Sequence, residues 1–219
     1  MSPPLAGRRV VVSAGPTFED IDPVRFLGNR SSGKMGFAIA AEAAARGADV
    51  VLVAGPVHLP TPPGVRRVDV RSAAQMRDAV LSALPCDAYI GAAAVADFTP
   101  RAPAASKLKK QPGQNTLVLE LVKTRDILAE VAAHARRPRL VVGFAAETDN
   151  VAGYARGKLE RKGVDLVCAN RVGAGATGFE SDDNALLVLG RDGFERALGP
   201  APKAALAGLL LDLAAERMD

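Results

Sequence analysis

The chain has 219 residues, 48% of them hydrophobic, which is enough for one domain with a packed core. Its formal charge of +4 suits an anionic small molecule, whereas an aromatic content of 4% and the lack of tryptophan argue against nucleic-acid binding. No apolar run approaches about 18 residues and the amino terminus has no apolar signal core, so we expect a cytoplasmic protein without membrane contacts.

Strand-like apolar runs alternate with helical patterns along most of the chain. The alternation predicts an α/β fold: a Rossmann-like, doubly wound, mostly parallel sheet with a C-terminal β-hairpin extension. Ser72, with Gln75 three residues later, forms a capping-box pattern. The predicted elements in chain order are strand 9–14, helix 32–46, strands 49–54 and 65–70, helix 72–84, strand 87–93, helix 126–135, strand 140–145, helix 151–162, a hairpin within 184–198 that turns at 191–193, and helix 203–218.

Parallel sheets of this kind bind ligands beyond the carboxyl ends of their strands. The stretches SAGPT (13–17), GAAAVAD (91–97) and GFAAET (143–148) follow or end predicted strands. We therefore expect all three to surround one crevice.

The stretch GNRSSGKMG (28–36) has the glycine and lysine spacing of a phosphate-binding P-loop. Met35 stands where a P-loop needs a serine or threonine hydroxyl for magnesium. The only convincing strand upstream, residues 9–14, is also too far away to lead directly into the loop. We conclude that this stretch is not an ordinary P-loop.

The sequence argues against a dinucleotide dehydrogenase, the third alternative, on similar grounds. The first turn, Ala14-Gly15-Pro16-Thr17, is not G-x-G-x-x-G, and the second strand ends in Ala54-Gly55-Pro56 without an acidic residue for the ribose.

The histidines and cysteines suggest no catalytic group. We expect His58 and His134 to be solvent-exposed, and Cys86 and Cys168 to be buried free thiols in a reducing compartment. An enzyme with this sequence would work mainly by positioning and by neutralising charge.

Two lysine-rich segments have chemical promise. ADFTPRAPAASKLKK (96–110) begins a long loop that either closes as a lid over a polyphosphate or is a solvated charge run. Lys158 and Lys162 share one face of the predicted helix 151–162, where they either contact a ligand or face solvent.

Several stretches together resemble one family, phosphopantothenate–cysteine ligase (phosphopantothenoylcysteine synthetase) of coenzyme A biosynthesis. They follow the family's order and span most of the chain as a single ligase domain over 1–219, with a nucleotide-binding core at about 8–170 and the hairpin and last helix at about 180–219. The stretches are SAGPT, DPVRFLGNRSSGKMGFAIA, LVAGPVHLPTPPGV, AAVADF followed by KLKK, VVGFAAET and FESDDNAL.

The resemblance implies a two-step reaction. A nucleotide activates the carboxylate of 4′-phosphopantothenate as an acyl-nucleotidylate and releases pyrophosphate; the amine of L-cysteine then displaces the monophosphate. The bacterial branch that this sequence resembles uses CTP with Mg²⁺, whereas eukaryotic relatives generally use ATP. The family's shared sites imply a homodimer, and in many bacteria a phosphopantothenoylcysteine decarboxylase precedes this domain in one chain.

The resemblance also implies roles for individual residues. Asn29 would contact the acyl intermediate, Lys107 would neutralise charge on the α-phosphate, and Arg25 would reach the substrate phosphate of a neighbouring protomer. Asp97 would organise Mg²⁺, directly or through the triphosphate. The implied nucleotide contacts are Gly15, Gly91, Ala92, Ala93, Asp97, Lys107, Arg125, Asp126, Ile127, Leu128, Phe144, Lys158 and Lys162, and the implied substrate contacts are Arg25, Asn29, Ser31 and Ala93.

Phe18 and Thr99 depart from the family, because many relatives carry arginine at both positions, and we expect them to reduce positive charge near the site. A non-catalytic nucleotide sensor remains as an alternative of another class. Residues alone do not decide whether the chain acts alone or is half of a bifunctional protein, nor how strictly it prefers CTP.

Overall fold

The computed structural model describes residues 3–110, 112–113, 115–147, 149–171 and 181–218. Its centre is an eight-stranded sheet with the order β12-β11-β10-β9-β6-β1-β4-β5. All neighbours from β10 to β5 pair in parallel, whereas β11 and β12 run antiparallel as the C-terminal hairpin. The strands are β1 (Arg9–Ala14), β4 (Asp49–Ala54), β5 (Val65–Asp69), β6 (Ala88–Gly91), β9 (Leu140–Glu147), β10 (Leu166–Arg171), β11 (Asp183–Gly190) and β12 (Glu195–Pro202).

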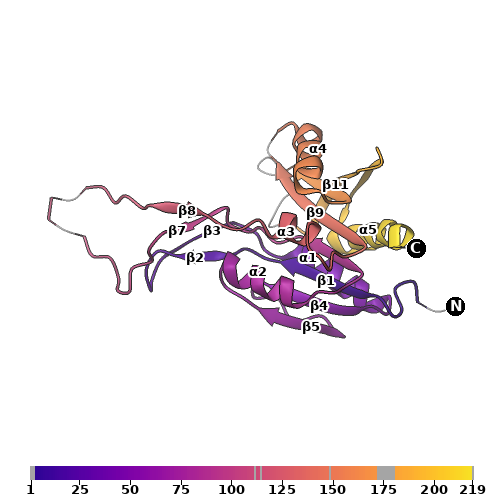
Figure 1. Cartoon of the computed structure of the whole chain (residues 1–219), viewed down its shortest axis with the longest axis horizontal. Coiled ribbons are helices and arrows are strands. Elements are labelled where there is room, and N and C mark those ends of the chain that lie inside the picture. The colour runs from indigo at the N-terminus through magenta and orange to yellow at the C-terminus, as the bar shows by residue number, and fades with distance from the viewer. Residues whose placement is uncertain (1–2, 111, 114, 148, 172–180, 219) are drawn as a thin grey trace.

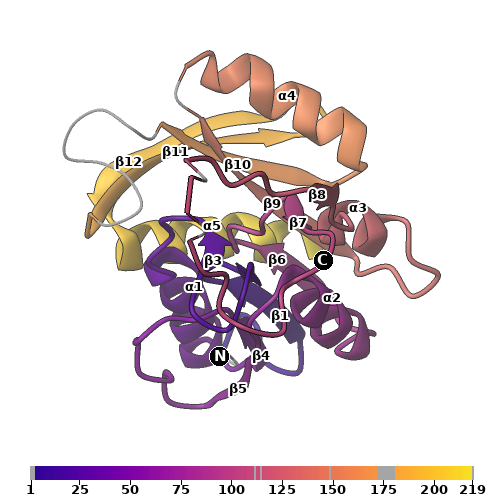
Figure 2. The ribbon, with the colours of Figure 1, turned by 90° about the vertical axis from the view of Figure 1, so that its left-hand side faces the viewer.

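Helices cover both faces of this sheet, as Figure 2 shows for α1 and α2 on either side of β1 and β4. Side chains of a strand alternate between the faces: Val10 and Val12 pack in the core under α1 and α5, and Val11 packs in the core under α2, α3 and α4. The helices are α1 (Lys34–Ala45), α2 (Ala73–Ser82), α3 (Ile127–Ala132), α4 (Val151–Lys162) and α5 (Lys203–Met218). The predicted doubly wound fold is therefore confirmed.

Many predicted boundaries agree with the structure. Strands β1 and β4 and helices α4 and α5 have the predicted bounds, and Ser72 forms the expected capping box with Gln75. Helix α1 begins at Lys34, two residues later than expected, because Gly33 precedes it in a left-handed conformation with φ of 76°. Helix α3 ends at Ala132, before the predicted end at 135.

Strand β10 and the two short hairpins are not among the predicted elements. Hairpin β2 (Phe18–Asp20) with β3 (Phe26–Gly28) leads directly into the glycine-rich stretch, so the view that no strand stands just upstream was wrong. This strand belongs to a separate two-stranded sheet, and the stretch consequently lacks the parallel-sheet cradle of a P-loop.

The described residues between 98 and 123 form an arm that projects far from the body (Figure 1). At its base, β7 (Phe98–Pro100) pairs antiparallel with β8 (Leu121–Lys123). The predicted long loop is thus present, but its described residues extend away from the sheet instead of closing over the strand ends.

Two glycines inside helices provide a matched test of the packing. A Cβ at Gly36 in α1 would lie 2.5 Å from the Cβ of Ala14, whereas a Cβ at Gly208 in α5 would have a flexible arginine nitrogen 3.5 Å away as its nearest neighbour. We expect Gly36→Ala to lower the free energy of unfolding by about 1–3 kcal/mol through overpacking. Gly208→Ala should raise it by up to about 1 kcal/mol through helix propensity. Urea unfolding measures both, and equal changes would contradict this account of α1 on β1.

Candidate active site

A crevice lies where the direction of strand succession reverses, between β1 and β6, as expected for a doubly wound sheet. It consists of a small cavity of about 150 Å³ and a large cavity of about 390 Å³. The two cavities are continuous, because they share lining residues at the ends of β6 and β9 and on α4. The shared residues are Ala93, Val95, Asp97, Phe144 and Lys158.

Basic groups of α4 line the small cavity. Lys158 Nζ donates to the carbonyl oxygen of Phe144 at 2.5 Å, and Lys162 forms an ion pair with Asp126, the N-cap of α3. Burial and the neighbouring charge of Lys162 lower the pKa of Lys158. Burial alone would raise the pKa of Asp126, but the hydrogen bond from Lys162 lowers it overall, so this carboxylate stays ionised.

Two buried hydroxyls also line the small cavity. Ser13 Oγ lies 3.0 Å from the hydroxyl oxygen of Tyr89, and burial raises the pKa of Tyr89 to about 12. The sequence analysis assigned neither residue, although Ser13 was in the SAGPT stretch. The cavity thus offers neutral hydrogen-bonding groups beside its basic ones.

The glycine-rich stretch forms one wall of the large cavity. Asn29 Nδ2 donates to the carbonyl oxygen of Ala94 at 2.9 Å, and Ser31 Oγ accepts from the backbone N–H of Gly33 at 3.3 Å. A Cβ at Gly33 would lie 3.4 Å from the Cα of Gly15, so two loops approach closely there. Glycine in this stretch therefore permits a turn and a close contact between loops.

The SAGPT turn holds the segment that follows β6 in place through hydrogen bonds. The backbone N–H of Ala94 donates to the carbonyl oxygen of Gly15 at 2.9 Å, and the backbone N–H of Ala96 donates to Thr17 Oγ1 at 3.0 Å. These bonds fix the segment that carries Asp97 to the end of β1. Of the three stretches expected around the crevice, SAGPT contributes only Ser13 to its lining, and Thr148 of the third lies outside the described residues.

The large cavity is also lined by four residues to which the sequence assigned no role: Lys34, Asn170, Asn184 and Lys203. Lys34 forms an ion pair of 2.6 Å with Asp182, and Lys203 Nζ donates to the carbonyl oxygen of Ser181. Burial lowers the pKa of Lys203, and the charge of Lys34 lowers it further. Asn184 lies in the FESDDNAL stretch, whose first two residues are outside the described part, while Asn170 carried no sequence signal.

Most sequence-predicted site residues come together in the crevice. Asn29, Ser31 and Ala92 line the large cavity, and Ala93 lines both. Gly15, Arg25 and Lys107 line neither cavity. The predicted residues that line the small cavity are Gly91, Ala93, Asp97, Arg125, Asp126, Ile127, Leu128, Phe144, Lys158 and Lys162.

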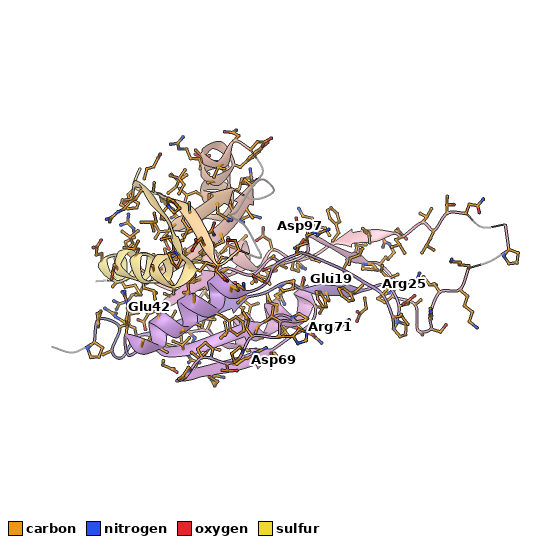
Figure 3. All side chains as sticks on the ribbon, turned by 180° about the vertical axis from the view of Figure 1, so that it is seen from behind. Glu19, Arg25, Glu42, Asp69, Arg71 and Asp97 are labelled. Atoms are coloured by element: carbon orange, nitrogen blue, oxygen red, sulfur yellow. The ribbon has the colours of Figure 1, made fainter. Side chains whose placement is uncertain are left out.

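Arg25 and Lys107 lie on the projecting part of the molecule, and Figure 3 shows Arg25 further along it than Asp97. Asp22 links the loop that carries Arg25 to the arm. One of its carboxylate oxygens accepts from Arg25 Nη2 at 2.5 Å and from the backbone N–H of Leu108 at 3.1 Å. The side-chain hydrogen bond from Arg25 holds the pKa of Asp22 well below its ordinary value. Lys107 itself is exposed.

Phe18 and Thr99 lie at the base of the arm, not in the crevice. Both line a third hollow of about 570 Å³, where the Phe18 ring stacks on that of Phe26 at 3.8 Å between centroids. This hollow shares Lys123, Thr124 and Arg125 with the small cavity, so both residues lie beside the crevice and outside its lining.

The described residues contain no group of three or more His, Cys, Asp or Glu side chains that could hold a metal ion. His58 is exposed as expected, whereas His134 is half-buried and accepts from the N–H of Arg136. Cys168 is buried and Cys86 half-buried, and burial raises the pKa of Cys86 to about 12. Within the described part, no helix has the length and apolar character needed to cross a membrane.

The fold and the crevice define a doubly wound α/β domain with a basic ligand site at its switch point. The chain belongs to the family described as the DNA/pantothenate metabolism flavoprotein C-terminal domain, whose model matches residues 5–218.

Two relatives are described as coenzyme A biosynthesis bifunctional protein CoaBC. The one from Vibrio cholerae is 50% identical over 98% of this chain and 54% of its own length; the one from Escherichia coli K12 is 51% identical over 96% and 52%. The chain therefore spans about half the length of these relatives.

Solved structures show the same fold. A crystal structure of a CoaBC C-terminal domain has a TM-score of 0.82 and 38% identity, covering 98% of this chain and 97% of that one. A Cab2 H337A variant in complex with phosphopantothenate-cysteine has a TM-score of 0.79 at 17% identity, covering 97% of this chain and 86% of that one, which supports the fold alone.

Proposed function

We propose that the chain ligates 4′-phosphopantothenate and L-cysteine to 4′-phosphopantothenoyl-L-cysteine, using CTP. The observation that carries this proposal is the convergence of Asn29, Asp97 and Lys158 on one continuous crevice, although they come from distant parts of the chain. The 38% identity to a solved CoaBC C-terminal domain, over nearly its whole length, supports it.

The small cavity would take the nucleotide. Lys158 and Lys162 provide positive charge for phosphate oxygens, and Asp97 lies where the two cavities join. A single carboxylate suits Mg²⁺ that arrives with a triphosphate, because Mg²⁺ commonly keeps its waters and takes one or two carboxylates plus phosphate oxygens. When bound, Mg²⁺ would neutralise phosphate charge, and Asp97 is the residue that would hold it.

The chemistry needs two displacements at this junction. A carboxylate oxygen of 4′-phosphopantothenate bonds to the α-phosphorus of CTP, and pyrophosphate leaves. The cysteine amine then bonds to the acyl carbon, CMP leaves with the electron pair of the broken C–O bond, and the amine loses a proton. Asn29, on the wall of the large cavity, would donate to the acyl oxygen as negative charge develops there.

The projecting region is proposed to pair with a second copy of the chain. Its exposed apolar side chains form an unusual concentration away from the body. The exposed apolar side chains are Val24, Phe26, Phe98, Leu117, Val118 and Leu121. Such a homodimer would bring Arg25 to a neighbouring site, as the family resemblance implies.

Because the relatives are described as bifunctional, we also propose a phosphopantothenoylcysteine decarboxylase region, on the same or another polypeptide, as a partner.

The function is tested by incubating the protein with CTP, Mg²⁺, 4′-phosphopantothenate and L-cysteine and following pyrophosphate and ligated product. We expect both to form in equal amounts and to depend on every substrate. Nucleotide binding without turnover would indicate a sensor and refute the ligase.

Nucleotide preference gives a second prediction. We expect a higher specificity constant with CTP than with ATP, because of the resemblance to the bacterial branch. Ser13 and Tyr89, which line the small cavity, would add side-chain hydrogen bonds to the nucleotide. Steady-state kinetics with each nucleotide decides this, and equal constants would refute the preference.

A further inference from the structure

Two buried amides face the large cavity on the wall formed by β10 and β11. Asn170 is 8% exposed and Asn184 is 4% exposed, and both line this cavity. Among the residues that the structure describes, none hydrogen-bonds to the side chain of Asn170. Asn184 uses Oδ1 to accept from the N–H of Ala185 at 3.0 Å, which leaves its Nδ2 for another partner. Because both amides line the open cavity, their unused donors and acceptors are available to a ligand there.

Positive charge lies on the same wall. Lys203 is only 6% exposed, yet it lines the cavity, and it is the first residue of the 16-residue helix α5. The positive end of the helix dipole therefore adds to its charge. Its Nζ donates to the carbonyl oxygen of Ser181, which holds the ammonium group at the edge of the cavity. An anionic group of a ligand suits this position.

The position of this wall relative to the other proposed subsites indicates which substrate carries the anionic group. The nucleotide is assigned to the small cavity, and the acyl group to the junction near Asn29. Phosphopantothenate must reach from that junction towards a phosphate site, which is assigned to Arg25 of a second copy. The wall of β10, β11 and α5 remains for the second substrate, the amino acid that attacks the acyl carbon.

We propose that Asn170, Asn184 and Lys203 form the subsite for the amino-acid substrate and hold its α-carboxylate. This inference rests on the proposed ligase function. Lys203 binds the carboxylate, and the two amides donate to it and orient the amine towards the acyl carbon. The subsite therefore distinguishes an α-amino acid from an amine that lacks the carboxylate.

The test compares L-cysteine with cysteamine, which has the same amine and thiol but no carboxylate. We expect the wild-type protein to prefer L-cysteine, and Lys203→Met to lower kcat/KM for L-cysteine by about 10–100-fold, the usual effect of losing a charge-assisted hydrogen bond. Lys203→Met keeps the long apolar stem and should not change kcat/KM for cysteamine. Asn184→Asp, which keeps the acceptor for Ala185 and repels a carboxylate, should lower kcat/KM for L-cysteine likewise.

The matched control is Arg196→Met, an exposed change on β12 that should affect neither amine substrate. An equal loss with L-cysteine and cysteamine would show a structural role and overturn the subsite. A raised KM for 4′-phosphopantothenate with unchanged KM for L-cysteine would assign the wall to the other substrate and also overturn it. If the wild-type protein forms no ligated product, the proposed function itself fails, which is a distinguishable result.

Discussion

Lys107→Gln is expected to stop pyrophosphate release almost completely, by on the order of 10³-fold or more, as when a cation that stabilises a transferring phosphate is removed. The lysine would neutralise charge on the α-phosphate while the acyl-cytidylate forms. Its side chain is exposed on the arm, so glutamine should leave the fold and the unfolding midpoint unchanged. A quenched assay of pyrophosphate with CTP and 4′-phosphopantothenate measures the effect.

Lys110→Gln is the matched control, because it makes the same change three residues further along the same exposed segment. It should retain near-normal release. If Lys107→Gln also retains near-normal release, the arm lysine does not stabilise the transferring phosphate.

Lys107 lines neither cavity in the described conformation. The next question is therefore whether it serves the crevice of its own subunit or that of the partner subunit. Mixed dimers of Lys107→Gln and Lys158→Met subunits answer it. If the arm serves the partner's crevice, one site in each mixed dimer has both lysines and release returns. If the arm folds back onto its own crevice, neither site is complete and release stays absent.

The sequence was sufficient to predict every strand of the central sheet except β10 and most of the residues that line the small cavity. Strands such as β1 and β4 are continuous apolar runs buried on both faces, which is typical of parallel strands. The parallel pairing of β6 with β9 then places Gly91 and Phe144 together at one edge of the sheet. Strand β10 was harder, because its apolar run is short and ends in Asn170 and Arg171.

The wall of the large cavity formed by β10, β11 and α5 could not be predicted from local patterns. Asn170, Asn184 and Lys203 come from β10, β11 and α5, and only the antiparallel pairing of β11 with β10 and β12 brings them to one cavity. The direction of the arm was also beyond a local pattern. It depends on hydrogen bonds from Arg25 and Leu108 to Asp22, a residue more than 80 positions from Leu108.

Asn29→Asp is expected to separate the two chemical steps. Asn29 does not line the small cavity, so CTP should still bind and the carboxylate of 4′-phosphopantothenate should still be activated. The ligation step should fall by about 10²–10³-fold, the usual cost of losing one donor to a developing oxyanion. Pyrophosphate would then appear in a burst while the ligated product lags and acyl-cytidylate accumulates.

The geometry of Asn29 explains why aspartate, although similar in shape, should be so damaging. One N–H of its amide donates to the carbonyl oxygen of Ala94 at 2.9 Å, and the second N–H remains for the acyl oxygen. An ionised aspartate has no donor, faces the Ala94 oxygen with negative charge, and favours the protonated, unreactive form of the incoming amine. Asn29→Ala removes both donors without adding charge, so it should accumulate the same intermediate but lose less ligation rate. Quenched reactions resolved by nucleotide chromatography measure both variants. If pyrophosphate and product fall together with no trapped acyl-cytidylate, Asn29 acts in binding or in the first step, and its assignment to the second step is wrong.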